Sequence, residues 1–468
     1  MKHKTDLPNR SHGFPTQHLP DSPRLRRRWC AAALCSLVAA AALAACGSTS
    51  TSPSSSAPSA STTLAASSGG GSTEAAASTS SCGPKPGVKA TGTPINIGAI
   101  ATKQPGTDFS DIPNMVSAYF SCVNDNGGIN GHPLKLFVQF DQTQPAQIAA
   151  AASQLVGTNH VVGIVGAFDL LECTIDQRLW THLGIYEMDA GTAPECWSTP
   201  NSAPINLGAR FSIDGAVQYA LAQHVDKVVF DTANTPGNGY FSGGAIELAR
   251  AAHVPITTEV DNVPITDANS VALHLVDQAG PNGAVVLGFT PPEALSILQA
   301  AQKLGLEDRV KEWGCSSPCA TDFLAKALGP KWEHKLFVNT ELTPPDGAST
   351  PEFQLYRAVL AKYGHDVSGG IGSFSQMGFV MGEFAVKALE HAKPPYTLKS
   401  VNAAFKGITD YHSDMLCRPW TYGDYPLHIP NSVDYTTTPE GGQMRTVQGC
   451  TPISSADPQI AQYHKVAG

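Results

Sequence analysis

The chain contains 468 residues, of which 42% are hydrophobic and 15% are charged, and its formal net charge at pH 7 is −9. An acidic chain of this kind argues against a nucleic-acid partner and against electrostatic docking on anionic lipid. The first 45 residues hold seven basic and two acidic side chains, so their removal would lower the net charge to −14.

The N-terminal segment has the pattern of a bacterial lipoprotein signal. Arginines between positions 24 and 28 form a positive region, and Trp29–Ala42 is apolar but too short for a convincing membrane span. The segment ends in the letters LAACG, in which small residues precede Cys46, whose thiol can take a diacylglycerol. We expect residues 1–45 to be removed and Cys46 to be lipidated, which would anchor the protein outside the cytoplasm on the cell membrane. The alternative is a plain secretory signal with an incidental cysteine.

Residues 46–92 predict a flexible tether. They are rich in Ser, Thr, Ala, Gly and Pro and contain almost no large apolar residue. Such a segment cannot bury enough surface to offset its chain entropy, so we expect it to be disordered. A tether of about 45 residues would span on the order of 35–40 Å, enough to hold a folded domain clear of the lipid.

The cysteines predict a set of disulfides. Cys30 and Cys35 would leave with the signal and Cys46 would carry lipid, which leaves eight of the 11. An even number on an exported chain indicates disulfides, although the sequence leaves their connectivity open. A metal site is the alternative, but the chain lacks paired CxxC-like spacings with histidine partners. The pairings that we favour, in order, are Cys315–Cys319, Cys417–Cys450, Cys173–Cys196 and Cys82–Cys122.

After the tether, short apolar runs alternate with amphipathic ones. About 375 residues remain, more than one core usually accommodates, so we expect at least two domains. Repeated βα units predict mostly parallel sheets covered by helices on both faces. The expected strands are Ile95–Ile100, Leu134–Phe140, Val161–Val165, Gly184–Met188, Lys227–Asp231, Ile256–Val260, Gly283–Gly288, Val310–Gly314 and Lys335–Thr340. The expected helices include Gln147–Val156, Ile213–His224, Ala245–Ala252, Asn269–Gln278, Glu293–Leu304, Thr321–Leu328 and Phe374–His391.

One run, at positions 124–140, has a more specific pattern. Its glycines tolerate positive φ at a helix end, Asn130-Gly131 predicts a turn, and alternating apolar residues from Leu134 predict a strand. The motif Asn-x-x-GGI-x-G-x-x-Leu follows the first strand by one helix. In this motif and its position the chain resembles the leucine/isoleucine/valine-binding protein family. These are the solute-binding proteins of branched-chain amino-acid ABC transporters. The resemblance implies an α/β fold with two doubly wound, mostly parallel-sheet lobes joined by a hinge, the type I periplasmic-binding-protein fold.

The resemblance also implies how the chain divides and what it does. In that family the chain crosses between the lobes three times. We therefore expect an N-terminal lobe from 93–212 plus 341–417 and a C-terminal lobe from 213–340 plus 418–468. The implied function is an extracytoplasmic solute-binding lipoprotein that captures a small polar solute, an amino acid or a related amide or carboxylate, in the cleft between the lobes. Its expected partners are that solute, the permease subunits of an ABC transporter and, through the lipid, the membrane.

Ligands of open α/β sheets bind beyond the carboxyl ends of the strands. The loops that follow the strands are therefore the candidate ligand-binding loops. The loop Gly191–Glu195 matches the family best, because relatives place a T-x-P-like turn at this point to bind the ligand's carboxylate through a hydroxyl and a backbone amide. The resemblance therefore implies that Thr192 and Gly191 bind the ligand. The alternative is a threonine that only caps a turn.

Two other loops depart from the family's pattern. Relatives have a serine-rich loop where this chain has Ala167, Phe168 and Asp169; backbone amides could still hold a carboxylate, but Asp169 would repel it unless neutralised. Relatives commonly place an acidic residue, which pairs with the ligand's ammonium group, where this chain has Ser316. A buried ammonium without a counter-charge is costly. The acidic residues that could replace it are Asp108, Asp169, Asp189 and Glu293.

Aromatic residues are expected to contact the ligand. Phe289, in the loop Phe289–Glu293, stands where some relatives have a tyrosine, and it keeps the apolar contact while losing the hydroxyl. Tyr240 and Phe109 could close over the ligand as lids. For each of these aromatic residues, packing in the core or at the hinge is the alternative.

No motif in the sequence indicates a catalytic site. The chain contains no HExxH, Walker A or G-x-S-x-G motif, so we expect neither an enzyme nor a cofactor or metal. Two alternatives to transport stay open: a ligand-sensing or structural lipoprotein of the same fold, and an extracytoplasmic enzyme that reuses it. The sequence does not identify the ligand.

Overall fold

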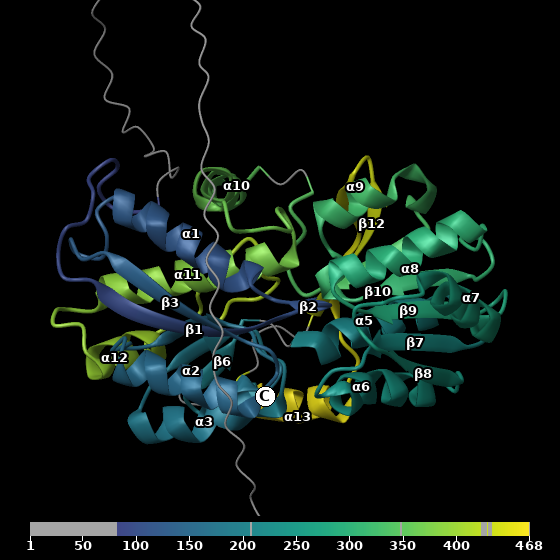
Figure 1. Ribbon diagram of the computed structural model, residues 1–468, viewed down its shortest axis with the longest axis horizontal. Coiled ribbons are helices and arrows are strands. Elements are labelled where there is room, and N and C mark those ends of the chain that lie inside the picture. Colours follow the sequence, from purple (N-terminus) through teal and green to yellow (C-terminus); the bar gives the residue numbers. More distant parts are fainter. Residues whose placement is uncertain (1–81, 206–207, 347–348, 423–427, 429–432, 468) are drawn as a thin grey trace, which may run out of the picture. The chain divides into compact units, whose positions relative to one another are not determined.

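A computed structural model describes residues 82–205, 208–346, 349–422, 428 and 433–467 (Figure 1). The predicted signal at 1–45, the predicted lipidation site Cys46 and the tether up to residue 81 lie outside the described residues. None of the helices described there combines the length and apolar character needed to cross a bilayer.

The first sheet contains strands from the N-terminal half of the chain. Its order is β2-β1-β4-β5-β6, and β3 pairs with residues 95–102 of β1. All pairs are parallel except β1 with the short β2, as βα units require. The strands are β1 (Ile95–Gln104), β2 (Thr107–Asp108), β3 (Leu134–Asp141), β4 (Ile164–Ala167), β5 (Glu187–Asp189) and β6 (Ser202–Pro204).

Helices cover both faces of this sheet. Figure 1 shows α1 above β1 and β3, with α2 and α3 below them. We call the first sheet with its helices the first lobe. Its helices are α1 (Asp111–Asp125), α2 (Pro145–Gly157), α3 (Glu172–Leu183), α4 (Pro194–Ser198), α10 (Pro351–Tyr363), α11 (Ser373–His391) and α12 (Leu398–Lys406).

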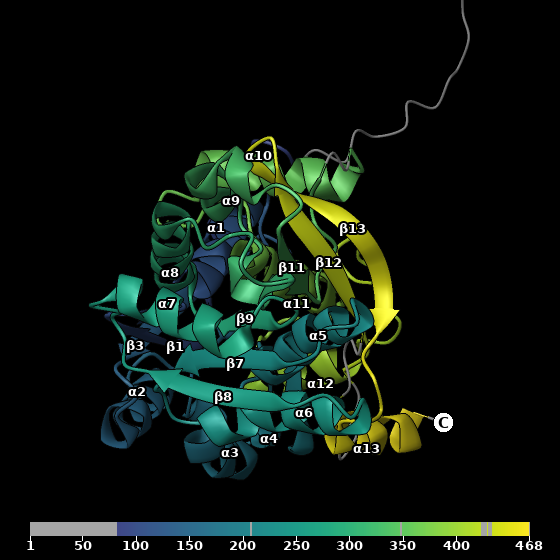
Figure 2. The same ribbon diagram turned by 90° about the vertical axis from the view of Figure 1, so that its right-hand side faces the viewer.

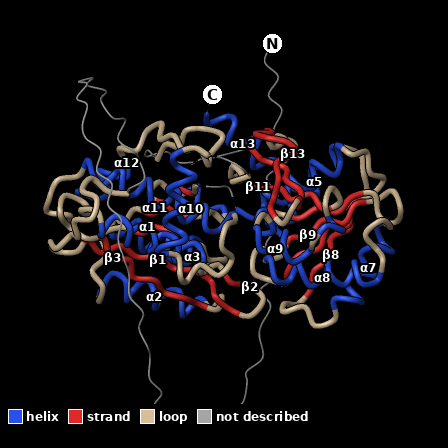
Figure 3. Tube along the Cα trace, turned by 90° about the horizontal axis from the view of Figure 1, so that it is seen from above, coloured by secondary structure: helices blue, strands red, loops and turns tan. Residues whose placement is uncertain are grey.

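The second sheet has the order β13-β12-β11-β10-β9-β7-β8, and it forms the second lobe. Its β7 to β11 part is parallel, whereas β12 pairs antiparallel with both β11 and β13. Figure 3 shows β8, β9, β11 and β13 on the right and β1 and β3 of the first sheet on the left. Helices α5 and α6 lie on one side of its strands, and α7 and α8 lie on the other (Figure 2). The strands are β7 (Val228–Ala233), β8 (Ile256–Asp261), β9 (Ala284–Gly288), β10 (Glu312–Cys315), β11 (Leu336–Thr340), β12 (Val433–Glu440) and β13 (Gln443–Pro452). The helices are α5 (Gly208–Ala222), α6 (Asn238–Ala251), α7 (Ala268–Ala279), α8 (Pro291–Leu304), α9 (Asp322–Leu328) and α13 (Pro458–Ala467), with the 3-10 turns η1 (Ser317–Cys319) and η2 (Pro330–Trp332).

The α/β architecture with two mostly parallel sheets confirms the expected fold class, and each of the nine expected strands overlaps an observed one. The hairpin β12–β13 is a difference, because the sequence predicts no strand in the C-terminal tail. Its turn uses Gly441 and Gly442, both at positive φ, and its first strand carries the β-branched residues Val433 and Thr436–Thr438. The hairpin adds two strands to the edge of the second sheet at β11.

The boundaries between the lobes differ in detail from the sequence expectation. Helix α5 begins at Gly208 and packs on β9, β10 and β11, so the second lobe starts before residue 213. Trp420 and Tyr422 still belong to the first lobe, because the Trp420 Nε1 donates to the Pro204 carbonyl at 3.0 Å and the Tyr422 hydroxyl donates to the Glu187 carbonyl at 2.7 Å.

Residues 82–92, which the sequence assigns to the tether, pack on the first lobe. Cys82 is buried and bonded to Cys122 of α1, and the Ala90 N–H donates to the Asn124 carbonyl at 2.8 Å. The folded part therefore begins before residue 93, because the disulfide fixes this segment to α1.

The eight remaining cysteines form the four expected disulfides. Cys173–Cys196 connects α3 to α4, and Cys315–Cys319 spans the turn after β10. Cys417–Cys450 joins the segment that carries Trp420 to strand β13 of the second sheet. This last disulfide therefore links the two lobes.

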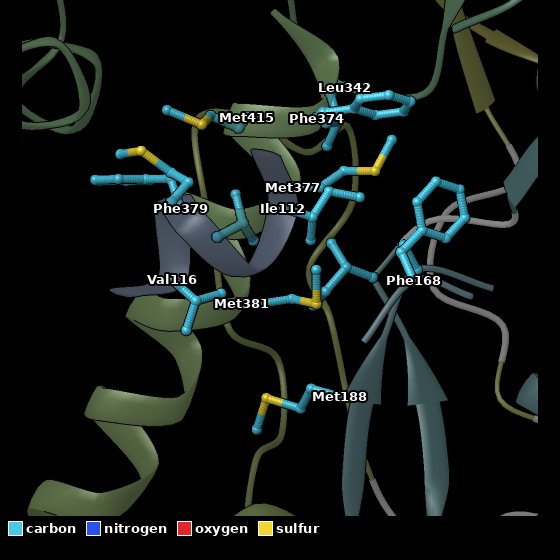
Figure 4. Packing of buried hydrophobic residues seen from close by; sticks show 14 of the residues in the cluster. Ile112, Val116, Phe168, Met188, Leu342, Phe374, Met377, Phe379, Met381 and Met415 are labelled. Carbon is cyan, nitrogen blue, oxygen red and sulfur yellow. The ribbon is translucent and has the colours of Figure 1, made fainter. Parts of the chain in front are cut away.

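The core of the first lobe is organised by the contact between α11 and α1. Ile112 and Val116 of α1 meet Met377 and Met381 of α11 (Figure 4). The two helices approach closely because Gly378 faces the Ile112 backbone, where an added Cβ would overlap the carbonyl oxygen.

A buried ion pair holds the end of the chain to the second lobe. Arg210 of α5 donates to both carboxylate oxygens of Asp457 at 2.7 Å, and Asp457 directly precedes α13. Burial, and then the hydrogen bond to Asp457, raise the pKa of the adjacent Asp214 well above its usual value. Arg210 is therefore the cation that balances this group of carboxyls.

We expect the Arg210→Met variant to lose about 3–5 kcal/mol of unfolding free energy, because Asp457 would stay buried without its counter-ion. Denaturant unfolding followed by circular dichroism measures the loss. Arg250→Met is the matched control: its partner is Glu247 and its side chain is 68% exposed, so its loss should be about 0–1 kcal/mol. Equal losses in the two variants would contradict the role of the buried pair.

Candidate functional site

A cavity of about 70 Å³ lies where loops of the two lobes meet. The first lobe supplies β2, the loop after β4 and the first turn of α11. The second lobe supplies the start of α5 and the residues that follow β7, β9 and β10, so the cavity lies at carboxyl ends of parallel strands, as expected for an open α/β sheet. We call it the inner cavity. It is lined by Gly106, Thr107, Phe109, Phe168, Leu170, Gly208, Ala209, Ser212, Ile213, Thr232, Ala233, Thr235, Phe241, Gly288, Phe289, Thr290, Ser316, Ser317, Pro318, Phe374 and Met377.

The inner cavity is aromatic and carries no formal charge on its described lining. Phe109, Phe168 and Phe374 of the first lobe form a cluster in which the ring centroids lie 4.3–5.8 Å apart. Phe289 of the second lobe lies in the opposing wall and is also buried. Such a surface suits an apolar or aromatic group.

Hydroxyl groups are the main polar side-chain groups of this cavity. The Thr107 side chain is 3% exposed, and its hydroxyl has no hydrogen-bond partner among the described residues. Two further hydroxyls connect the lobes: Thr290 donates to the Gly106 carbonyl at 3.1 Å, and Ser373 donates to the Ser317 carbonyl at 2.8 Å. The lobes are thus in direct contact around the cavity.

A second cavity of about 310 Å³, which we call the outer cavity, adjoins the inner one. The two share Gly106, Thr107, Thr290 and Phe374 in their linings. The outer cavity is acidic, because the charged residues of its described lining are Asp108, Asp111 and Glu293.

The three carboxylates of the outer cavity differ in how many of their oxygens already accept hydrogen bonds. Asp111 accepts hydrogen bonds on both oxygens from the backbone of residues 368 and 369. Asp108 accepts from the Ser110 N–H and lies 3.8 Å from Lys103. Glu293 is 8% exposed and accepts from the Ile265 N–H through Oε2 at 2.7 Å; its Oε1 accepts no hydrogen bond from the described residues.

The structure brings Phe109, Phe168, Phe289 and Ser316 together at the inner cavity and places Glu293 at the outer one. It does not bring Gly191, Thr192, Ala167 or Asp169 to either lining. The Thr192 hydroxyl donates to the Asp169 carbonyl at 2.6 Å, so it is already bonded within the first lobe.

Asp169 stabilises the start of α3 rather than facing the cavity. Its Oδ1 accepts from the N–H groups of Leu171 and Glu172, and its Oδ2 accepts from the Thr102 hydroxyl at 3.0 Å. A carboxylate at the first turn of a helix is favoured by the helix dipole. Sequence spacing identifies this loop but not the direction of its side chains.

Tyr240 also lies away from the cavities. Its ring packs on the Arg210 guanidinium at 4.7 Å and lies 5.9 Å from Trp197. The next residue, Phe241, lines the inner cavity instead, since consecutive residues of α6 point in different directions.

Phe374 and Met377 also line the inner cavity, and the sequence analysis does not name them as site residues. Both lie in the first turns of α11, a helix that the sequence predicts, and this position was the available signal.

The first lobe buries several carboxyl groups near the predicted ligand loops. Burial raises the pKa of Asp189 to about 8, although a hydrogen bond from Ser202 opposes this. Burial and the neighbouring Asp169 raise the pKa of Asp141 to about 8 and that of Asp176 to about 7. Burial also raises the pKa of Glu172 and Glu187 well above the usual range. These groups hold protons near neutral pH.

Two groups of these residues have a spacing that could suit a metal ion: Cys173, Asp189 and Cys196, and Glu172, Cys173 and Glu187. Cys173 and Cys196 are bonded to each other, however, so neither offers a thiolate. The first group retains a single carboxylate and the second retains two. Neither set matches a known structural metal site.

Comparison with known proteins links this architecture to solute binding. A family model described as periplasmic binding protein matches residues 94–431. A Pseudomonas aeruginosa protein named amino acid binding protein is 24% identical over 294 residues, covering 61% of this chain and 70% of that protein. A branched-chain amino acid ABC transporter protein from Thermus thermophilus, solved with bound valine, superposes with a TM-score of 0.67 at 17% identity, over 79% of this chain and 100% of that one. A fatty acid ABC transporter substrate-binding protein from Thermomonospora curvata gives a TM-score of 0.63 at 17% identity, over 80% and 97%.

The buried carboxyls predict that the folded protein becomes less stable as the pH rises. A carboxyl with a pKa near 3.8 when unfolded and about 8 when folded binds its proton more tightly in the folded state. Stability is therefore lost progressively from about pH 4 to about pH 8. Thermal unfolding at intervals between about pH 5 and about pH 8 should show a falling midpoint. The Asp189→Asn variant, which removes one such group, should show a shallower decline, and an unchanged decline would exclude Asp189 as a contributor.

Proposed function

The chain belongs to the periplasmic binding protein family, and from this membership we propose that it is a lipid-anchored receptor that captures a small solute and delivers it to an ABC permease. The family consists of substrate-binding proteins rather than enzymes, and it works outside the cytoplasm. The observation that carries the proposal is the cavity at the carboxyl ends of the strands, to which both lobes contribute side chains.

The mechanism that we propose is closure of the two lobes around the solute. A solute that contacts Phe168 in one lobe and Phe289 in the other binds the closed form better than the open one. The hydrogen bonds from Thr290 and Ser373 stabilise the same form without a solute. The permease would then distinguish the loaded receptor by its closed shape.

Two of the similar structures support a small solute of partly apolar character. One was solved with valine, and another is described as a fatty acid transporter's binding protein. Both superpose on this chain at 17% identity, so they support the class of function and leave the solute of this protein open.

We expect at least one compound of a panel of amino acids, amines, amides and small organic acids to raise the thermal unfolding midpoint of the protein from residue 47 onward. Small-angle scattering with that compound should show closure. The Thr290→Val variant removes one hydrogen bond between the lobes and should bind the compound about 2- to 10-fold more weakly.

The control for this experiment is Thr181→Val. Its hydroxyl donates to Asn201 Oδ1 at 3.0 Å within the first lobe, so binding should not change. Absence of stabilisation and of closure with every compound would refute the receptor proposal. Binding without any loss of solute uptake in cells that lack the protein would instead favour a ligand-sensing role.

Lipid anchoring predicts that Cys46 is modified. Cells grown with an alkyne-tagged fatty acid should incorporate the tag into the protein, and the Cys46→Ala variant should lose the tag and leave the membrane fraction. Cys30→Ala and Cys35→Ala are the matched controls, because both lie in the segment expected to be removed. Retention of the tag in Cys46→Ala would contradict the proposed anchor.

A further inference from the structure

We propose that the solute is an apolar amine without a carboxylate group, with its hydrocarbon part in the inner cavity and its ammonium group on Glu293 in the outer cavity. This inference rests on the proposed function of the two cavities as the solute site. It is argued from the charges of the linings, from the hydrogen bonds that are already made, and from the size of the cavities.

The linings of both cavities offer a carboxylate no cationic partner. Neither described lining contains a lysine, an arginine or a histidine. Lys103, the cation that pairs with Asp108, is not part of either lining. A carboxylate in the inner cavity would be buried without a counter-charge, which is costly, and in the outer cavity it would face three acidic residues.

Glu293 is the acidic residue best placed to receive an ammonium group. It lines the outer cavity at the first turn of α8, directly after the shared residue Thr290 and two prolines. The Ile265 N–H fixes its Oε2, which leaves Oε1 as an open acceptor on a side chain that is more than nine-tenths buried. Asp111 has both oxygens occupied, and Asp108 is 48% exposed, so an ion pair with it would be weaker.

The size of the cavities fits an amine with one ring or a short branched chain. Since about 10–15 Å³ of such space holds one water molecule, the inner cavity admits roughly five to seven water-sized groups. A phenyl ring has a similar number of carbon atoms and would lie against Phe109, Phe168 and Phe374. The shared wall residues Thr107 and Thr290 mark the passage through which the chain of the amine would reach Glu293.

Four probes with one phenyl ring separate the charge classes. These are 2-phenylethylamine, its neutral counterpart 2-phenylethanol, the anion 3-phenylpropanoate and the zwitterion phenylalanine. Isothermal titration of the protein from residue 47 onward should show that the amine binds at least about tenfold more tightly than each of the other three. Tighter binding of the anion or of phenylalanine would overturn the inference.

The Glu293→Gln variant tests the assigned partner. Glutamine keeps a carbonyl oxygen for the Ile265 N–H but loses the charge, so the amine should lose its advantage over 2-phenylethanol while the affinity for the alcohol stays the same. Glu247→Gln, which removes a partly exposed carboxylate of α6 that lines neither cavity, should leave all four affinities unchanged. An amine preference that survives in Glu293→Gln would refute the role of Glu293.

The outcomes also separate this inference from the proposed function. If the anion or the amino acid binds and closes the lobes, the protein is a solute receptor and only the amine inference fails. If none of the four probes binds and the wider panel also gives no stabilisation, both fail. If Glu293→Gln unfolds, the comparison of amine and alcohol on the unaltered protein still decides the solute class.

Discussion

The close packing of α11 on α1 is the constraint on which both the core and the cavity depend. Gly378 lets the two helix backbones approach, and the side chains of Met377 and Met381 then fill the space beside Ile112. The same contact fixes the first turn of α11. Phe374 is thereby held in the wall of the inner cavity, and Ser373 is held within hydrogen-bonding distance of the second lobe. A core contact thus determines the position of a cavity wall.

The strands and the fold class followed from the sequence because apolar periodicity is set by burial, and every expected strand is a buried or half-buried one. The strands that the sequence did not predict have other causes. β2 and β6 are two or three residues long, too short to show a period, and β12–β13 is a threonine-rich hairpin that depends on β11 as its neighbour. For the candidate site, the sequence predicted loops that line the cavity but not which of their side chains face it. Residues 168, 289 and 316 were found because each follows a strand.

Side-chain direction accounts for the site residues that the sequence misplaced. Thr192 and Asp169 lie in the nominated loops, but neither side chain faces a cavity. The Thr192 hydroxyl donates to the Asp169 backbone carbonyl, and the Asp169 carboxylate accepts from backbone N–H groups at the start of α3. Tyr240 and Phe241 are neighbours in one helix, and the larger polar ring packs on Arg210 while the apolar one reaches the cavity. These choices are made by tertiary partners distant in the chain, which local patterns do not encode.

The disulfide Cys417–Cys450 has a mechanical consequence for the lobe closure that we propose. Cys417 lies in the segment secured to the first lobe through Trp420, and Cys450 lies on the outermost strand of the second sheet. A covalent link between the two lobes limits how far they can separate when they open, but it does not oppose their closure. Such a bond persists in the oxidising environment outside the cytoplasm, where it would limit the separation of the lobes in the open form. A reducing agent would break the bond and allow a wider separation.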